Sequence, residues 1–299
     1  MTEPGLLAPH LRARKAIGLG TAPIGGLYTP VDDETAWATL DRAWELGIRT
    51  FDTAPLYGSG LAERRLGVFL QDKRRDAFVL STKVGRLLRP DAAGWEGAYF
   101  DFSFDGALRS LAASLDRLGL DRVDVALVHD PDDHYEEARH GAFRALTRLR
   151  DEGAVSAVGV GMNHTPLLAR FAREADPDCF LVAGRYTLLD RSAPEELLPL
   201  CEERAIDVIA AGVFNSGVLA GGSTFDYRTA SPEIVERVDW LRETCARYGV
   251  PLAAAAVQYP LRHPAVKTVV VGCRTPAEVE EDVRLSVLDI PETLWEEIG

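Results

Sequence analysis

The stretch that decides the fold is Arg49-Thr-Phe-Asp-Thr-Ala-Pro-Leu-Tyr-Gly58. Its first half carries β-branched and aromatic residues and predicts a short buried strand. The strand must end before Pro55, because proline has no N–H for a strand ladder, and Gly58 permits a sharp turn. Asp52 is therefore expected at the carboxyl end of a strand, with Tyr57 in the loop above it. A buried carboxylate there needs a positive partner, because an unpaired one is costly to bury.

Strand-like and helix-like segments alternate along the chain on both sides of this stretch. The other predicted strands are 16–22, 78–84, 123–129, 155–161, 179–186, 207–214 and 268–272. The predicted helices are 33–46, 62–71, 104–118, 135–152, 166–175, 194–204, 232–248 and 276–285. Residues 85–103, which are rich in glycine and aromatic residues, are predicted to form one long loop of the functional or disordered kind.

Eight apolar strands, each followed by a helix, predict a parallel sheet covered by helices. Eight such units in a chain of 299 residues favour a closed (β/α)8 TIM barrel that spans residues 1–299 as a single domain. The alternative is an open, Rossmann-like sheet. Its Gly-x-Gly-x-x-Gly fingerprint is absent after the first strand, where the chain reads Gly18-Leu-Gly-Thr-Ala-Pro23. We therefore expect the barrel.

Composition limits the class of protein. Hydrophobic residues make up 46% of the chain and charged residues 26%, as in ordinary globular proteins. The net charge of −13 argues against a nucleic-acid partner and against anionic membranes. The four cysteines lie far apart and are expected to be reduced core residues. Without a basic leader or an apolar run of about 18 residues, we expect a cytoplasmic protein. The sequence leaves the oligomeric state open.

Polar residues stand at the carboxyl ends of three neighbouring predicted strands, which is the active face of such barrels. Asp52 ends the second strand, Lys83 lies on the third and His129 ends the fourth, while Tyr57 follows Asp52 in its loop. Lys83 is the positive partner that Asp52 needs. Asp52 and Lys83 could instead form a structural ion pair, and His129 could be a core histidine. The meeting of all four on the active face favours a catalytic site.

These four side chains suit proton transfer at an oxygen atom. A free tyrosine has a pKa of about 10 and is a poor base at neutral pH. An adjacent lysine ammonium stabilises the phenolate and lowers that pKa, while Asp52 balances the lysine. His129 can hydrogen-bond and orient the same substrate oxygen. The set can interconvert C–OH and C=O, provided that a cofactor carries the hydride.

Two other readings use some of the same residues. A metal cluster on a hydrolase barrel could use His129, Asp130, Asp132, Asp133 and His134. Such barrels usually also carry a His-x-His on the first strand, which is missing, so no metal is expected and Asp130–His134 is predicted to be a solvated loop. Lys83 could form a Schiff base if it were desolvated. Pairing with Asp52 would keep it charged and non-nucleophilic.

Four blocks resemble the signature sequences of the aldo-keto reductase superfamily over essentially the whole chain: Phe51-Asp-Thr-Ala-x-x-Tyr-Gly58, Ser81-Thr-Lys-Val84, Val128-His-Asp130 and Gly159-Val-Gly161. Gly18–Tyr28 and Tyr186–Arg191 resemble its bacterial branch that oxidises L-fucose and related D-threo-aldoses at C1, near pyridoxal 4-dehydrogenase. The resemblance implies that Tyr57 is the general acid/base and that Lys83 and Asp52 adjust its pKa. It also implies that His129 donates the hydrogen bond that orients the substrate.

The activity that this resemblance implies is an NAD(P)-dependent aldose 1-dehydrogenase acting on a small sugar or aldehyde. The alternatives are a pyridoxal 4-dehydrogenase or a general aldehyde or ketone reductase. A reading from another class is a cofactor-binding regulatory subunit on the same fold. Within residues 85–103, Trp95 is expected to wall the substrate site, although it could equally pin the loop to the barrel.

The resemblance also implies the cofactor contacts. Near the nicotinamide they are Gly20, Thr21, Ala22, Asp52 and Asn163; at the pyrophosphate Phe214, Asn215, Ser216 and Gly217; and at the adenosine Gly272, Arg274, Glu278 and Asp282. Two positions depart from the family pattern. The glutamine usual on the sixth strand is missing near Ala183, and Ala211 replaces the aromatic residue that stacks on the nicotinamide.

The adenosine block favours NAD over NADP. By the resemblance, NADP-using members carry a lysine where Gly272 stands and an arginine where Glu278 stands. A carboxylate repels a 2′-phosphate but can accept a hydrogen bond from a free ribose 2′-OH. Arg274 remains the one candidate for pairing with a phosphate.

Overall fold

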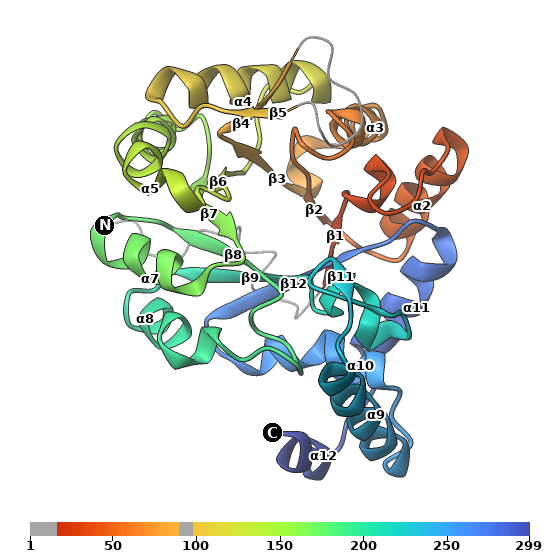
Figure 1. Ribbon diagram of the computed structural model, residues 1–299. Helices are drawn as coiled ribbons and strands as arrows, with labels where there is room; N and C mark the ends of the chain where they lie inside the picture. Colours follow the sequence, from red (N-terminus) through yellow and green to blue (C-terminus); the bar gives the residue numbers. More distant parts are fainter. Residues whose placement is uncertain (1–16, 90–97) are drawn as a thin grey trace.

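A computed structural model describes residues 17–89 and 98–299 of the chain. Eight parallel strands close into a barrel in the order β1-β12-β9-β8-β7-β6-β3-β2, with helices around the outside (Figure 1). The predicted (β/α)8 barrel is confirmed. Its strands are β1 Ile17–Gly20, β2 Thr50–Asp52, β3 Val79–Val84, β6 Val125–His129, β7 Ala157–Met162, β8 Cys179–Ala183, β9 Asp207–Ala211 and β12 Val266–Gly272.

The helices begin where short polar side chains can cap them. Asp32, Ser103, Ser231 and Thr275 each accept a hydrogen bond from the backbone N–H three residues further on. The helices are α2 Asp33–Glu45, α3 Leu61–Leu70, α4 Phe104–Leu118, α5 Tyr135–Glu137, α6 Phe143–Asp151, α7 Thr165–Glu174, α8 Leu197–Glu203, α9 Pro232–Arg247, α10 Leu252–Gln258, α11 Pro276–Ser286 and α12 Glu292–Ile298.

The core forms two layers. The larger one fills the space between strands and helices. A smaller cluster groups side chains from several strands and is built from Val79, Val125, Leu127, Ala157, Cys179, Leu181, Ile209 and Val270. Since side chains alternate along a strand, residues two positions further on lie on the same side as these. This alternation places Lys83 and His129 on the same side as the small cluster, at the carboxyl ends of β3 and β6.

The loop predicted for residues 85–103 has regular structure at both ends. Arg86–Leu88 forms β4 and Ala98–Phe100 forms β5, and the two pair as an antiparallel hairpin. Trp95 lies outside the described residues.

The helix predicted for residues 135–152 is also not uniform. A π-helical turn, Ala138–Ala142, separates α5 from α6. A Cβ at Gly141 would lie 2.4 Å from the carbonyl oxygen of Phe102, so the wide turn with its glycine lets the chain entering α4 approach closely.

A second hairpin and two helices were also not predicted. The hairpin pairs β10 Thr224–Phe225 with β11 Arg228–Thr229. The helices α10 and α12 lie with α9 at one edge of the barrel (Figure 1). No helix in the two described ranges is long and apolar enough to cross a membrane.

Candidate active site

Asp52 and Lys83 form a buried ion pair at the carboxyl end of the barrel. The two residues lie on adjacent parallel strands, β2 and β3, and Lys83 Nζ is 2.7 Å from Asp52 Oδ2. Ser81 donates a hydrogen bond of 2.7 Å to the other carboxylate oxygen, and Lys83 donates one of 2.9 Å to the carbonyl of Thr53. Asp52 therefore has the positive partner that the sequence required.

Tyr57 completes a chain of contacts with this pair. Lys83 Nζ lies 3.1 Å from the phenol oxygen, in the loop directly after β2. Burial raises the pKa of Tyr57 above its ordinary value, and the ammonium of Lys83 opposes that rise without cancelling it. Lys83 thus lowers the pKa of Tyr57 as expected, but the rise caused by desolvation is larger. Tyr57 holds its proton at neutral pH.

Asp52 and Tyr57 keep the side chain of Lys83 protonated. Burial alone would lower the pKa of Lys83, but Asp52 and Tyr57 raise it above its ordinary value. The side chain is therefore a permanent ammonium at physiological pH. A charged amine is not a nucleophile, which weighs against the Schiff-base reading.

His129 ends β6 with its ring edge-on to that of Tyr57, at 6.2 Å between ring centroids. Burial, together with the charges of Lys83 and Arg86, lowers the pKa of His129 well below its ordinary value. The imidazole is therefore neutral, and one of its nitrogens carries a proton to donate. Its Nδ1 atom is buried and has no hydrogen-bond partner among the described residues. The structure thus brings all four predicted catalytic side chains together.

Asp130 differs from its predicted setting. It was expected in a solvated loop, but its Oδ2 atom accepts a hydrogen bond of 2.8 Å from Arg86 of the β4–β5 hairpin. The same oxygen lies 3.6 Å from His129 Nε2. Only the hairpin, which periodicity did not predict, brings Arg86 to this position. In the described part of the chain no three His, Cys, Asp or Glu side chains are grouped to hold a metal ion.

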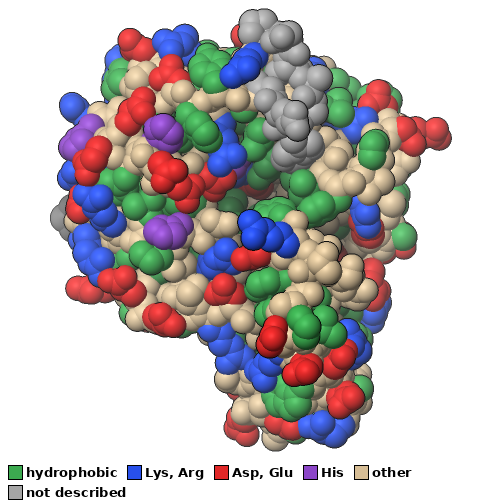
Figure 2. All heavy atoms as spheres, viewed as in Figure 1, with side chains coloured by type: hydrophobic (Ala, Val, Ile, Leu, Met, Phe, Trp, Pro, Cys, Tyr) green, Lys and Arg blue, Asp and Glu red, His purple; other side chains and the backbone are tan. Residues whose placement is uncertain are grey.

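The predicted cofactor residues occupy the neighbouring sector of the barrel mouth. Most follow β9, β12 and β1, which are adjacent in the barrel, next to the catalytic residues of β2, β3 and β6. Thr21 is buried, and both its N–H and its hydroxyl bond the carbonyl oxygen of Asp52, at 2.9 and 3.0 Å. The space-filling view shows a hollow near the middle of this face, edged by hydrophobic and charged side chains (Figure 2).

The loop predicted to hold the pyrophosphate makes a tight left-handed turn. Asn215, Ser216 and Gly217 have φ values of +46°, +60° and +102°. A Cβ at Gly217 would meet nothing within 4 Å, so the backbone there borders open space. Asn215 is buried, and its Oδ1 atom has no partner among the described residues. Phe214, before the turn, is half-buried. Backbone that borders open space lets a cofactor phosphate approach, and the unused amide oxygen can accept a hydrogen bond from a hydroxyl or amide group of the same cofactor.

The residues predicted to contact the adenosine, Gly272, Arg274, Glu278 and Asp282, interact mainly with one another and with their neighbours. Glu278 accepts from the backbone N–H of Arg274 at 2.7 Å and forms an ion pair of 2.9 Å with its guanidinium. A Cβ at Gly272 would lie 2.8 Å from Cγ of Pro23, so a longer side chain would meet that ring. Asp282 turns toward the thiol of Cys273, 3.3 Å away, and burial raises the pKa of Asp282 to about 6.

The remaining predicted contacts lie around the nicotinamide sector. Gly20 ends β1, and the half-buried Ala22 follows Thr21. Asn163 follows β7 and is exposed, and its carbonyl accepts a hydrogen bond of 2.9 Å from Arg185. Ala183 and Ala211, the two departures from the family pattern, are paired in register on β8 and β9. Two small residues therefore lie side by side where larger ones were expected.

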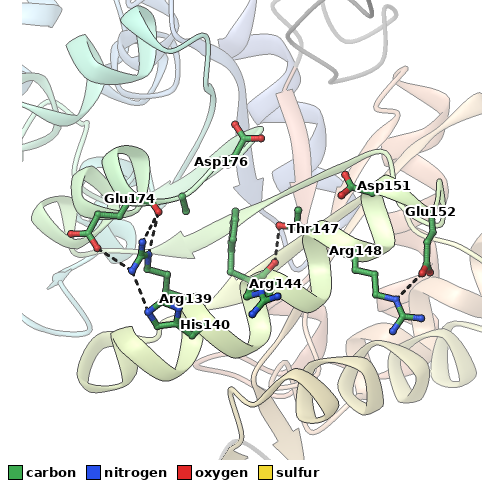
Figure 3. Close-up of a pocket in the computed structure, with 11 residues that line it drawn as sticks. Arg139, His140, Arg144, Thr147, Arg148, Asp151, Glu152, Glu174 and Asp176 are labelled. Carbon is green, nitrogen blue, oxygen red and sulfur yellow. Dashed lines mark hydrogen bonds and ion pairs between the residues drawn. The ribbon is translucent and has the colours of Figure 1, made fainter.

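A separate pocket lies on the outside of the barrel, between the α5–α6 segment and the end of α7 (Figure 3). Its charges are largely paired with one another: Arg148 bonds Glu152 at 2.7 Å, and Arg139 lies 3.5 Å from Glu174. None of the predicted site residues lines it. The catalytic candidates therefore belong to the barrel mouth and not to this outer pocket.

Comparison with known proteins gives the chain its family. The model of the Aldo/keto reductase family matches residues 16–298. A D-threo-aldose 1-dehydrogenase from a Pseudomonas species is 43% identical, covering 100% of this chain and 97% of that protein. A pyridoxal 4-dehydrogenase from Microbacterium luteolum is 42% identical, covering 94% of this chain and 92% of that protein.

A solved structure agrees with the sequence matches. The holo form of an aldo-keto reductase from Bacillus halodurans superposes with a TM-score of 0.76 at 27% identity, covering 94% of this chain and 90% of that one. The chain is therefore a member of the aldo/keto reductase family and an NAD(P)-dependent oxidoreductase.

Proposed function

We propose that the protein oxidises the anomeric carbon of an aldose to a lactone, with NAD as the preferred acceptor and Tyr57 as the general base. One observation carries this proposal: Lys83 Nζ is within hydrogen-bond distance of both Asp52 Oδ2, at 2.7 Å, and Tyr57 Oη, at 3.1 Å. The names of the two relatives above 40% identity support an oxidation at a sugar or alcohol carbon.

In the proposed reaction the anomeric hydroxyl lies between Tyr57 and His129. Tyr57 takes the hydroxyl proton while Lys83 stabilises the phenolate from which it starts. Neutral His129 donates a hydrogen bond to the same oxygen and keeps it in line. The bound nicotinamide supplies the acceptor for the hydride that leaves C1. The O–H and C–H bonds break, and the second C–O bond of the lactone carbonyl forms.

The preference for NAD rests on Glu278. Its carboxylate forms an ion pair of 2.9 Å with the guanidinium of Arg274. Arg274 was the one candidate cation in this block for pairing with a 2′-phosphate, and its charge is balanced by Glu278. Pro23 stands where a side chain at position 272 would have to pass. A ribose 2′-OH can donate to Glu278, whereas a phosphate there would meet a carboxylate. Gly20, Thr21, Ala22, Asn163, Asn215, Ser216 and Gly217 are proposed to hold the rest of the cofactor.

A pyridoxal 4-dehydrogenase activity is the second candidate, supported by the relative at 42% identity. The two are separated by measuring initial rates of NADH and NADPH formation with a panel of aldoses and with pyridoxal. Aldose oxidation with the higher kcat/KM is the expected result. A higher value for pyridoxal would transfer the assignment, and no turnover of either would refute both.

A further inference from the structure

The backbone at Asp130 is held in an unusual conformation beside the catalytic residues. Asp130 has a φ of +42°, in the left-handed region that few residues other than glycine adopt, directly after His129 at the end of β6. Its N–H donates to the carbonyl of Gly161 at 3.0 Å, which fixes the turn to β7. Strained backbone concentrates at functional sites, where it points a side chain in a required direction. Here the turn brings the carboxylate next to His129.

The carboxylate and its partner both keep unused hydrogen-bonding atoms. Among the described residues, the only hydrogen bond to the Asp130 side chain comes from Arg86 Nη2, at 2.8 Å, and it goes to Oδ2. The buried Nε atom of Arg86 has no partner within that same part of the chain. The pair is partly open, since the side chains of Arg86 and Asp130 are 22% and 29% exposed. A ligand hydroxyl could donate to Asp130 Oδ1, while Arg86, whose Nε atom is buried, holds the carboxylate in position.

This pair borders the reacting groups and one exposed aromatic ring. Asp130 Oδ2 is 3.6 Å from His129 Nε2, too far for a hydrogen bond but near enough to share one substrate. The guanidinium of Arg86 lies 5.3 Å from the ring centre of Phe100, which is 54% exposed. The negative charge of Asp130 is among the causes that raise the pKa of Tyr57, behind burial. Paired charges beside an exposed ring suit a ligand that has hydroxyl groups and an apolar face.

We propose that Asp130 and Arg86 form a hydroxyl-binding subsite that makes this enzyme selective for substrates with a hydroxyl group close to the reacting carbon. The inference rests on the proposed function, because it places the reacting oxygen at Tyr57 and His129. It adds the residues that would select a polyhydroxylated carbonyl compound, or its hemiacetal, over a simple aldehyde. The competing explanation is that Asp130 only orients His129.

The test compares glyceraldehyde with propanal, which share a three-carbon skeleton and differ by two hydroxyl groups. Each is reduced with NADH by the unchanged protein, by Asp130→Asn and by Arg86→Met. The ratio of kcat/KM for glyceraldehyde to kcat/KM for propanal should fall about 10- to 100-fold in both variants, the loss expected for a hydrogen bond to a charged group. The fall should come mainly from a higher KM for glyceraldehyde. Asp76→Asn removes a carboxylate from a surface pair with Arg74 and serves as the control.

The outcomes separate the explanations. If Asp130 only orients His129, kcat falls equally for both aldehydes, the ratio stays constant and the subsite is refuted. A native ratio near one would also overturn it. Melting temperatures of the variants show whether they fold. Glyceraldehyde is too short to close the cyclic hemiacetal that the proposed oxidation uses, so the result does not depend on whether cyclic aldoses are oxidised to lactones. Inactivity toward cyclic aldoses with a falling ratio would refute the proposed function and leave the subsite intact.

Discussion

Gly25 and Gly58 pack backbone against backbone across the loops that follow β1 and β2. A Cβ at Gly58 would lie 2.2 Å from the carbonyl oxygen of Gly25, and a Cβ at Gly25 would lie 2.9 Å from the carbonyl carbon of Tyr57. Gly58 also has a φ of +62°. Because neither glycine has a side chain, the two loops can pack directly against each other. This contact fixes the loop that carries Tyr57 and therefore the position of its phenol.

Replacing Gly58 by alanine should displace Tyr57. A shift of about 1 Å at a catalytic group can cost about 10²-fold in rate, so kcat should fall by that order together with the melting temperature. Gly249→Ala is the matched control: its φ is +67°, but an added Cβ meets nothing within 4 Å. The control should lose about 1 kcal/mol of folding stability and keep its kcat. Equal kcat in the two variants would contradict the contact's role.

Tyr57→Phe should stop the chemistry and spare the fold. The ring remains, but the oxygen that exchanges the proton is gone, so kcat should fall by at least about 10²-fold. Cofactor affinity, measured by quenching of protein fluorescence, should hold. Tyr248→Phe removes a hydroxyl that bonds Glu297 at 2.8 Å on the outer surface, and is the control. Near-normal turnover of Tyr57→Phe would exclude Tyr57 as the general acid/base.

The pH dependence of oxidation should follow Tyr57. Its pKa is raised by burial, and oxidation needs the phenolate, so kcat/KM for oxidation should rise from neutral into alkaline pH. Lys83 opposes that rise in pKa, and Lys83→Met should therefore move the rising limb to higher pH. A limb that stays in place or moves to lower pH would rule out Lys83 as the group that tunes Tyr57.

Lys83→Met alone leaves Asp52 buried without its partner, at a cost of about 3–5 kcal/mol. A double variant, Asp52→Asn with Lys83→Met, removes both charges and keeps the test open if the single variant does not fold. Lys83 affects the pKa of Tyr57 more than Asp52 does. In the double variant the rising limb of the pH profile should therefore still move to higher pH, by less than in Lys83→Met.

Cofactor preference should depend on Glu278. Glu278→Arg places a guanidinium where the carboxylate stood and releases Arg274, so kcat/KM should shift toward NADP by about 10-fold or more, the effect of one charged hydrogen bond to phosphate. Glu281→Arg makes the same change in net charge from an exposed pair with Arg284 and is the control. Native preference for NADP, or equal shifts in the two variants, would reject Glu278 as the discriminator.

The sequence predicted the features that arise from local pattern. Apolar strands followed by helices predicted the barrel, and parallel strands necessarily bring their carboxyl ends together, so Asp52, Lys83 and His129 could be placed on one face before any coordinates. The ion pair between Asp52 and Lys83 could also be predicted, because a buried carboxylate requires it.

The sequence could not predict contacts that depend on irregular pairing. The turn of the β10–β11 hairpin uses Asp226 and Tyr227, both at positive φ, where Asn-Gly or Asp-Gly is the usual signal. The helix α10 is a short run dominated by alanine, without the polar face that reveals a surface helix. The net pKa of Tyr57 depends on how completely the packed site excludes water, which no motif encodes.

The division of the barrel mouth has a consequence for how such an enzyme can change. The groups that exchange the proton come from β2, β3 and β6, and most of the proposed cofactor contacts follow β9, β12 and β1. Arg86 and Phe100 instead belong to a hairpin inserted between β3 and α4, outside the barrel's hydrogen-bond network. Its sequence can therefore change without altering the barrel's strand pairing, provided that the contact of Arg86 with Asp130 beside His129 is kept or replaced. New substrate ranges could evolve here by replacing one insertion while the redox chemistry is inherited intact.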